Sequence, residues 1–325
     1  MTLLVLSGAD VRALFPPKES LAPMRDALKA LSRGEAHQPL RPVVAPEGAA
    51  GLLAMMPAYT AAAGYGVKIV CLFAGNTALG LDAHQGAMLL FSGDTGEALA
   101  LLNASVLTEL RTPAVTAVAT EALARPDAAE LTVFGIGVQG AAHIRTLAAV
   151  RPLTRVRVVA RDAARAERVC AVLSAELGLP VEVAPSPEEA VRAADIVVTA
   201  TNAASPLLRR EWLRPGTHVN AVGSCVPHTR ELDTPTIAEA RVFVDSIESA
   251  THEAGDYLFA RREGAIGPAD LTPLGDVLLG RAPGRESAEQ ITVFESVGLA
   301  VQDLAAARFI HRRAAETGAG TRVAY

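Results

Sequence analysis

The spacing of apolar residues divides the chain into a front part and a back part. Up to about residue 124, helical spacing gives way to strand-like runs and then returns in one long segment. From residue 131 onward, short apolar runs alternate regularly with helical segments. The first pattern is typical of an α+β domain, and the second is typical of an α/β domain built on a parallel sheet.

In the front part, Ser7 is expected to cap a helix over residues 9–15, and a second helix is predicted over 18–32. A third, longer helix is predicted over 106–124, with Ser105 as its N-cap. Strands are predicted over 41–45, 51–56, 65–73, 87–91 and 98–103. These strands indicate a mostly antiparallel sheet, which is not a nucleotide-binding fold.

The back part has the rhythm of a doubly wound sheet. Strands are predicted over 131–134, 155–159, 181–183, 196–199, 218–221 and 242–244. Helices between them are predicted over 163–177 and 187–193. A last helix over 296–316 lies beyond this alternation, and we expect it to pack back on the front domain.

The junction between the first of these strands and its helix carries a glycine motif. The strand 131–134 runs directly into Gly135-Ile136-Gly137-Val138-Gln139-Gly140, and a helical pattern follows at once. In this context the first glycine permits the tight turn, the second lets a pyrophosphate approach the backbone, and the third lets the helix pack on the strand. The helix N-terminus offers free N–H groups to the phosphates. The motif therefore predicts a Rossmann dinucleotide-binding domain.

The end of the second strand bears on the choice between NADP and NAD. An acidic residue at this point binds the ribose 2′-hydroxyl of NAD, but the expected position holds Ala160. Arg161 follows and can pair with a 2′-phosphate, so the sequence favours NADP. Asp162 leaves NAD open, since a shift of one residue in the strand end would bring it into the reading position.

Three cations in the front domain stand in apolar surroundings. Arg41 opens a predicted strand, Lys68 lies inside the apolar strand 65–73, and Arg111 lies on the long helix among Ala, Val and Thr. A charge in such a place is costly unless it has a partner. Together the three could bind a substrate carboxylate, for which arginine is geometrically suited. The alternative for Arg41 and Arg111 is a solvated surface charge.

The composition narrows the class of protein. The net charge of −5 without a basic tract argues against nucleic acid as a partner, and no segment is long and apolar enough to cross a membrane. The three cysteines are far apart, which suits a reducing cytoplasm and gives no disulfide framework. The histidines lack metal-ligand spacing, and no Ser-His-Asp arrangement or G-x-S-x-G sequence is present. We expect a cytoplasmic enzyme without a metal.

Several segments, in order along nearly the whole chain, resemble the ornithine cyclodeaminase/mu-crystallin family. They are Val67-Lys68-Ile69-Val70, His84-Gln85-Gly86, Leu110-Arg111-Thr112, Gly135-Ile136-Gly137-Val138-Gln139, Asn220-Ala221-Val222-Gly223 and Val293-Phe294-Glu295-Ser296-Val297-Gly298. The resemblance implies a homodimer whose N-terminal sheets pair across the two-fold axis. It also implies a substrate-binding and dimerisation domain over 1–118 with 302–325, and a Rossmann domain over 119–301.

The resemblance also assigns site residues. Arg41, Lys68 and Arg111 match the family's substrate-carboxylate residues. The glycine motif, the strand ends and the resemblance together give these cofactor candidates: Arg111, Gly135, Gly137, Val138, Gln139, Gly140, Arg161, Thr201, Asn220, Ala221, Val222 and Ser296.

Two positions depart from the cyclodeaminase pattern. Cyclodeaminases carry a glutamate just before the Met-Pro of the second strand, where this chain has Ala54. They also carry an aspartate shortly after N-A-V-G, where this chain has Cys225 or at best Ser224. Without either carboxylate, the chain lacks groups to hold a δ-amino nitrogen during ring closure.

The expected function is therefore NAD(P)H-dependent reduction of a small cyclic ketimine carboxylate, Δ1-pyrroline-2-carboxylate or Δ1-piperideine-2-carboxylate. Lys68 is the expected catalytic residue, because it could protonate the imine nitrogen or position the water that does. An ornithine cyclodeaminase or an alanine dehydrogenase-type enzyme remains an alternative. A non-catalytic, crystallin-like NADP-binding protein is the alternative from another class.

Overall fold

The computed structural model describes residues 2–324, except for the side chain of Thr77. The chain forms two units, of which the first holds the residues up to Arg111 together with those from Leu299 onward. The second unit is Thr112–Gly298. Whether these units are also the functional domains, with the boundaries expected from the sequence, stays a prediction.

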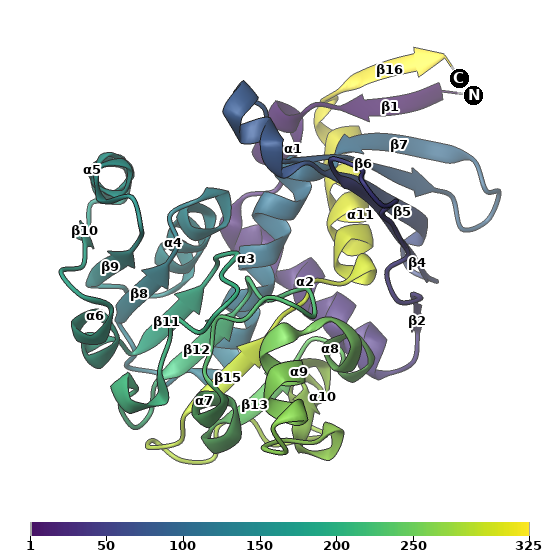
Figure 1. Ribbon diagram of the computed structural model, residues 1–325. Helices are drawn as coiled ribbons and strands as arrows, with labels where there is room; N and C mark the ends of the chain where they lie inside the picture. Colours follow the sequence, from purple (N-terminus) through teal and green to yellow (C-terminus); the bar gives the residue numbers. More distant parts are fainter. Residues whose placement is uncertain (1, 325) are drawn as a thin grey trace. The chain divides into compact units, whose positions relative to one another are not determined.

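The first unit is built on one mixed sheet. Its described strands are β1 (Thr2–Leu6), β2 (Ala36–His37), β3 (Val43–Val44), β4 (Leu52–Thr60), β5 (Gly64–Leu72), β6 (His84–Phe91), β7 (Ala98–Asn103) and β16 (Thr321–Ala324). Their order is β16-β1-β7-β6-β5-β4-β2, with β3 also paired to β4. The central strands β4 to β7 are antiparallel, as the sequence predicts. The chain ends add β1, parallel to β7, and β16, antiparallel to β1 (Figure 1).

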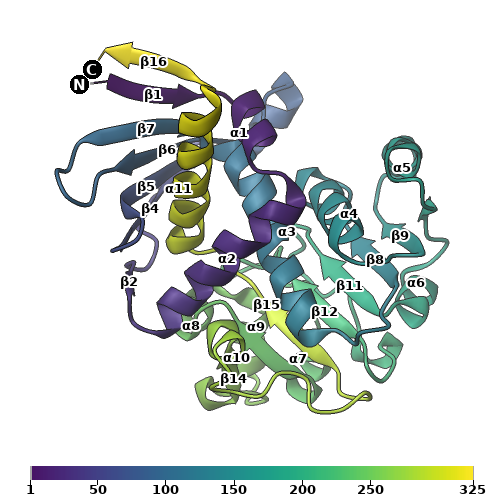
Figure 2. The ribbon, with the colours of Figure 1, turned by 180° about the vertical axis from the view of Figure 1, so that it is seen from behind.

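One face of this sheet is covered by helices of the same unit. The helix α11 (Ala300–Thr317) packs against β4, β5 and β6 and lies beside α2 (Pro17–Ser32) (Figure 2). The side chains under α11 are buried because every second residue of a strand points to the same face. Gly66 permits the close approach, since a Cβ there would lie 2.9 Å from Leu304 Cδ1. The expectation that the last helix packs on the front domain is confirmed.

The sequence predicted one helix cap of this unit correctly and another wrongly, and it missed some of the strands. Ser7 caps α1 (Gly8–Leu14) in a capping box with Asp10, as predicted. The predicted cap of α3 (Ala104–Leu123) is wrong: the Oδ1 atom of Asn103 accepts the Val106 N–H, while the Ser105 hydroxyl donates to the backbone of β6. The strands β1 and β16 were not predicted, and β3 is shorter than the predicted range 41–45.

The second unit is a parallel α/β sheet. Its described strands are β8 (Glu130–Phe134), β9 (Arg155–Val159), β10 (Val181–Val183), β11 (Ile196–Thr199), β12 (His218–Ala221), β13 (Arg241–Val244), β14 (Leu271–Pro273) and β15 (Thr292–Glu295). The order is β10-β9-β8-β11-β12-β15-β13-β14, and each neighbouring pair is parallel. The strand order reverses beside β8, which gives the Rossmann-type fold that the sequence predicts.

Helices connect the parallel strands. They are α4 (Val138–Val150), α5 (Ala163–Leu177), α6 (Pro187–Ala193), α7 (Thr234–Glu239), α8 (Ile247–Glu253), α9 (Gly255–Arg262) and α10 (Leu274–Leu278), with 3-10 turns at Arg210–Trp212 and Pro268–Asp270; a further such turn, Ala74–Leu79, lies in the first unit. The strands β14 and β15 were not predicted, and the last helix begins at Ala300 rather than at 296. Gly298 explains the later start, because its φ of 78° lies outside the helical region.

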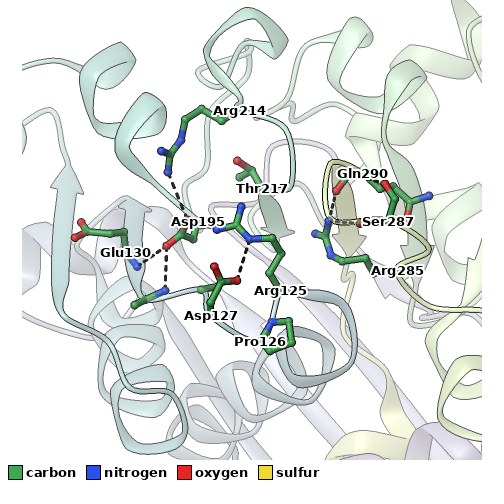
Figure 3. A network of polar contacts seen from close by, with 12 residues as sticks. Arg125, Pro126, Asp127, Glu130, Asp195, Arg214, Thr217, Arg285, Ser287 and Gln290 are labelled. Carbon is green, nitrogen blue, oxygen red and sulfur yellow. Dashed lines mark hydrogen bonds and ion pairs between the residues drawn. The ribbon is translucent and has the colours of Figure 1, made fainter.

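The amino ends of the parallel strands are tied by one carboxylate. Asp195, directly before β11, accepts hydrogen bonds from the backbone N–H groups of Ala129 (3.0 Å) and Glu130 (3.1 Å) (Figure 3). Arg125 donates to the same carboxylate at 2.9 Å, and Arg214 lies 3.4 Å from it. This network fixes the starts of β8 and β11 at the edge of the sheet opposite to the glycine turn.

No helix in the part of the chain that the structure describes is long and apolar enough to cross a membrane.

Candidate functional site

Lys68 lies in the middle of β5, on the helix-covered face of the first unit's sheet. Its neighbours across the ladder are Met56 on β4 and Met88 on β6, and its side chain is 2% exposed. A lysine in such apolar surroundings needs a counter-charge, because an unpaired buried charge is costly. The sequence signalled the burial of Lys68 correctly.

The counter-charge comes from Asp303 in the first turn of α11. Its Oδ2 atom lies 2.7 Å from Lys68 Nζ, and its Oδ1 atom accepts a hydrogen bond from Arg111 Nε at 2.9 Å. The Arg111 Nη1 group donates to Gln302 Oε1 at 3.0 Å, and Lys68 Nζ also lies 3.3 Å from Thr108 Oγ1. One carboxylate therefore holds two of the three predicted cations side by side.

The charges of this cluster shift one another's pKa values. Burial lowers the pKa of Lys68 to about 8, against the opposing pull of Asp303, and the neighbouring charges of Arg111 and Arg41 lower it further. Burial alone would raise the pKa of Asp303, but Lys68 and Arg111 hold it below its ordinary value. Lys68 can therefore lose a proton within about one unit of neutral pH, which an ordinary lysine cannot do.

Arg41 and His84 border the cluster. Arg41 precedes β3, is partly exposed, and lies near enough to act on the pKa of Lys68. Burial lowers the pKa of His84 to about 4, with the charge of Lys68 as the next cause, so this imidazole is neutral at physiological pH. The structure thus brings together all three cations predicted as carboxylate ligands, and it adds Asp303, Gln302 and a neutral histidine.

In the second unit, the glycine turn has the geometry that its motif implies. Gly135 follows β8 with a φ of 90°, and a Cβ on Gly140 would lie 1.9 Å from the Gly135 carbonyl oxygen. A Cβ on Gly137, the N-cap of α4, would meet nothing within 4 Å, so the space in front of the helix is open. Val138, which is exposed, and Gln139, which is partly exposed, begin the first turn of α4. These residues fit a pyrophosphate at the helix N-terminus.

The residues that favour NADP or NAD have distinct places after β9. Arg161 is exposed, whereas the Oδ1 atom of Asp162 caps α5 by accepting the Arg165 N–H at 2.9 Å. The carboxylate proposed as the NAD alternative is therefore already engaged in the fold.

Arg111, also predicted as a cofactor contact, lies on α3, and the other cofactor candidates lie at the carboxyl ends of β11, β12 and β15. Thr201 is partly exposed, and Ala221 and Val222 are buried. The amide of Asn220 donates to Thr120 Oγ1 at 3.0 Å inside the core, so a cofactor could reach Asn220 only through its backbone. Ser296 is also buried, and its hydroxyl donates to Asp245 at 3.2 Å.

Sequence reasoning missed one group of residues in this unit. Both carboxylate oxygens of Glu231 accept hydrogen bonds at the ends of β11 and β12, from Thr201 and from the Gly223 N–H. Nothing in the polar sequence around Glu231 distinguishes it from a surface glutamate. Among the described residues, no group of three or more His, Cys, Asp or Glu side chains is placed to hold a metal ion.

Comparison with known proteins yields one family. Residues 2–318 match the model of the ornithine cyclodeaminase/mu-crystallin family. The chain is 36% identical to the ketimine reductase mu-crystallin of Mus musculus, over 90% of each chain. It is 34% identical to the structure of Δ(1)-pyrroline-2-carboxylate reductase of Thermococcus litoralis in complex with NADH and L-proline, with a TM-score of 0.95 over 99% of this chain and 100% of that one. An archaeal alanine dehydrogenase dimer with bound NAD gives a TM-score of 0.94 at 32% identity, over 100% of both chains.

Proposed function

This chain belongs to the ornithine cyclodeaminase/mu-crystallin family, and on that premise we propose that it reduces a small cyclic ketimine carboxylate to the cyclic amino acid. It is an NAD(P)-dependent oxidoreductase. The proposed substrates are Δ1-pyrroline-2-carboxylate and Δ1-piperideine-2-carboxylate, since the similar reductases act on ketimines or on the first of these compounds by name.

The observation that carries this proposal is the buried cluster around Lys68. Two cations share one carboxylate, and Arg41 adds a third positive charge nearby. The excess positive charge suits an anionic substrate, and a bidentate arginine suits a carboxylate. A substrate carboxylate held in this way would be fixed in orientation, which favours reaction by lowering its entropic cost.

Lys68 is the proposed proton donor. A nicotinamide cofactor, when bound, supplies a hydride to the imine carbon, and the ring nitrogen needs one proton to become an amine. With a pKa of about 8, Lys68 is mostly protonated at neutral pH yet gives up its proton more readily than an ordinary lysine. Asp303 keeps the ammonium group in place and stabilises its charge.

We propose NADP as the preferred cofactor. Arg161 is exposed beyond β9, where the 2′-phosphate of NADP would lie, and the carboxylate of Asp162 is occupied as a helix cap. The similar structures contain NADH or NAD, so NAD stays the alternative. The KM values for NADPH and NADH with the same substrate distinguish the two.

A homodimer is proposed from the open face of the first unit's sheet. Along each strand, residues that point to this open face alternate with residues that point to the helix-covered face. The open face carries partly exposed apolar side chains on neighbouring strands: Leu53, Met55, Tyr59, Val67, Ile69, Leu89, Phe91 and Leu101. An apolar surface of this kind is typical of a protein–protein interface. Sedimentation of the wild type as a monomer would exclude the dimer.

The deciding experiment is a substrate comparison. Oxidation of NADPH and NADH is followed with Δ1-pyrroline-2-carboxylate, Δ1-piperideine-2-carboxylate, and pyruvate plus ammonia, and ornithine is tested for release of ammonia. We expect turnover with at least one cyclic ketimine. Turnover with pyruvate and ammonia alone would favour the alanine dehydrogenase alternative, which the archaeal structure supports. Cofactor binding without any turnover would favour the crystallin-like alternative.

A further inference from the structure

Three buried carboxyl groups of the second unit meet one another instead of meeting cations. Glu231 and Asp256 are 0% exposed and Glu295 is 1% exposed. No ion pair joins any of them to a lysine or arginine among the described residues, although Arg230 attracts Asp256 at longer range. Burying like charges without a counter-ion is costly, so the cluster needs a physical reason.

Glu231 has a clear structural task. Its Oε1 atom accepts hydrogen bonds from the backbone N–H (2.6 Å) and the hydroxyl (2.7 Å) of Thr201, and its Oε2 atom accepts the Gly223 N–H at 2.8 Å. The carboxylate therefore ties the segment after β11 to the segment after β12. The two segments are in close contact, since a Cβ on Gly223 would lie 2.1 Å from the Thr201 carbonyl oxygen.

Asp256 fixes the backbone at Glu231. Its Oδ1 atom accepts the backbone N–H groups of Glu231 (2.7 Å) and Leu232 (2.9 Å). Asp256 is in the first turn of α9, and its own N–H is held by Ser224 Oγ at 3.0 Å. The position of Glu231 is thus fixed from behind by a second buried carboxyl group.

Glu295 completes the cluster at the end of β15. Its partners across the ladder are Ala221, the last residue of β12, and Val244 on β13. Its Oε2 atom is buried and has no hydrogen-bond partner within residues 2–324 as described. Four titratable groups act on it: Asp256 from α9, Glu231 from the segment before α7, Asp245 after β13 and Cys225 after β12.

The titration of the cluster follows from this geometry. Burial, reinforced by the neighbouring carboxylates, raises the pKa of Glu295 well above its ordinary value. Burial also raises the pKa of Asp256 to about 7 and raises that of Glu231, against the opposing hydrogen bonds from Thr201 and Gly223. The group with the unpartnered oxygen therefore keeps its proton to a higher pH than an ordinary glutamate does.

We propose that Glu231 is the positioning residue for the two cofactor-binding segments, and that a proton on Glu295 keeps the buried carboxyl groups from forcing those segments apart. The inference rests on the proposed function, since it takes Thr201 and Val222 as cofactor contacts. On this inference the three carboxyl groups affect the affinity for the cofactor indirectly. They act through the backbone and side chains that they hold in place.

The test measures NADH binding by fluorescence titration in the wild type and in two variants. NADH is the probe because, unlike NADPH, it lacks a 2′-phosphate that titrates near neutral pH. In E231Q, the amide NH2 faces the N–H of either Gly223 or Thr201, so one segment is released. We expect about tenfold weaker binding, as for one lost charge-assisted hydrogen bond, with kcat at saturating cofactor almost unchanged. E248Q, at an exposed glutamate of α8, is the matched control.

The second variant, E295Q, tests the proton. As the pH rises from about 6 to about 9, the wild type should lose about tenfold in NADH affinity, the equivalent of one pKa unit. E295Q cannot ionise at this position, so its affinity should fall less than that of the wild type over this range, and Asp256 accounts for the pH dependence that remains. If E231Q fails to fold, this arm still tests the proposal through its second claim, the proton on Glu295.

The outcomes separate the inference from the proposed function. If the wild type does not bind NADH or NADPH at all, the proposed function fails. If the wild type binds and a folded E231Q binds equally well, the positioning role is overturned. A pH profile of E295Q that parallels the wild type overturns the role of the proton.

Discussion

Each unit of this protein buries a cluster of charged side chains, and the two clusters are built in opposite ways. In the first unit, the carboxylate of Asp303 lies between Lys68 and Arg111, so attraction offsets the cost of burial. In the second unit, Glu231, Asp256 and Glu295 lie together, and no cation of the described residues forms an ion pair with them. The first cluster keeps its charges near neutral pH, whereas the second keeps a proton.

The difference shows how one chain can bury titratable groups either to release a proton or to retain one. In the mixed cluster, burial and counter-charge act against each other, which leaves the pKa of Lys68 at about 8. In the acidic cluster, burial and like charges act together, and the pKa of Glu295 rises well above its ordinary value. A proton at Lys68 can therefore leave during a reaction, while the proton on Glu295 serves the structure.

The largest effect is expected from Lys68→Met, which removes the titrating group of the mixed cluster and keeps much of its volume. Turnover of a cyclic ketimine should fall by about 10²–10⁴-fold, the usual value of proton delivery by a placed group. Binding of NADPH should persist, because the proposed cofactor residues of the second unit are intact. Steady-state kinetics and a fluorescence titration measure the two effects. Lys29→Met, on α2, is the matched control, and wild-type turnover in Lys68→Met would remove Lys68 from the mechanism.

Asp303→Asn should remove the negative charge that balances the two cations of the same cluster. The variant leaves two buried cations without their carboxylate, which is expected to cost about 3–5 kcal/mol of unfolding free energy. Since Asp303 raises the pKa of Lys68 against burial, its loss should lower that pKa below about 8. Reduction requires protonated Lys68, so the alkaline limb of kcat/KM should move to lower pH.

Urea unfolding and a pH–rate profile test this prediction. Asp26→Asn, at an exposed aspartate of α2, should change neither quantity. An alkaline limb in Asp303→Asn at the wild-type position would mean that another group sets it.

The sequence predicted the regular part of the fold well. The strands β9, β10, β11 and β12 and the helices α5 and α6 have the predicted bounds, because each is a short apolar or amphipathic run between clear breakers. The strand β1 and the edge strand β16 were missed because their pairing joins the two ends of the chain, which no local pattern reveals. β15 was missed because its four residues precede a predicted helix without a breaker that the pattern could register.

Only part of the candidate site could be predicted from the sequence. A charge flanked by apolar residues singled out Lys68, whereas Asp303 follows the polar Gln302 and escapes the strict form of this rule. Glu231 and Asp256 escape that rule, since their neighbours include Arg230 and Gly255 and their burial arises from tertiary packing. The functional assignments of all these residues stay predictions until the variants are measured.

A smaller effect is expected at the amino ends of the parallel strands, where Asp195 is paired with cations and backbone N–H groups (Figure 3). Asp195→Asn replaces one acceptor oxygen by a donor and should cost about 1–3 kcal/mol of unfolding free energy, the cost of leaving a buried partner unsatisfied. Asp127→Asn, at the exposed aspartate that also pairs with Arg125, is the control and should leave stability unchanged. Equal effects at the two positions would contradict the contrast between a buried and an exposed partner.

The smallest effect, and the sharpest test of the contrast between the clusters, is the pH dependence of stability in Glu295→Gln. The pKa of Glu295 is raised in the folded state, so the native protein binds a proton that the unfolded chain has already released. The unfolding free energy of the wild type should therefore fall as pH rises from about 4.5 toward the raised pKa, by at most about 1.4 kcal/mol per pH unit from this group. The glutamine variant loses that slope and keeps those from Glu231 and from Asp256, whose window ends at a pKa of about 7. Trp212, the single tryptophan of the chain, lies in the second unit and reports its unfolding in urea. If the wild type and Glu295→Gln lose stability in parallel between about pH 5 and pH 8, the glutamate is already ionised in the folded protein and the acidic cluster is not held by a proton.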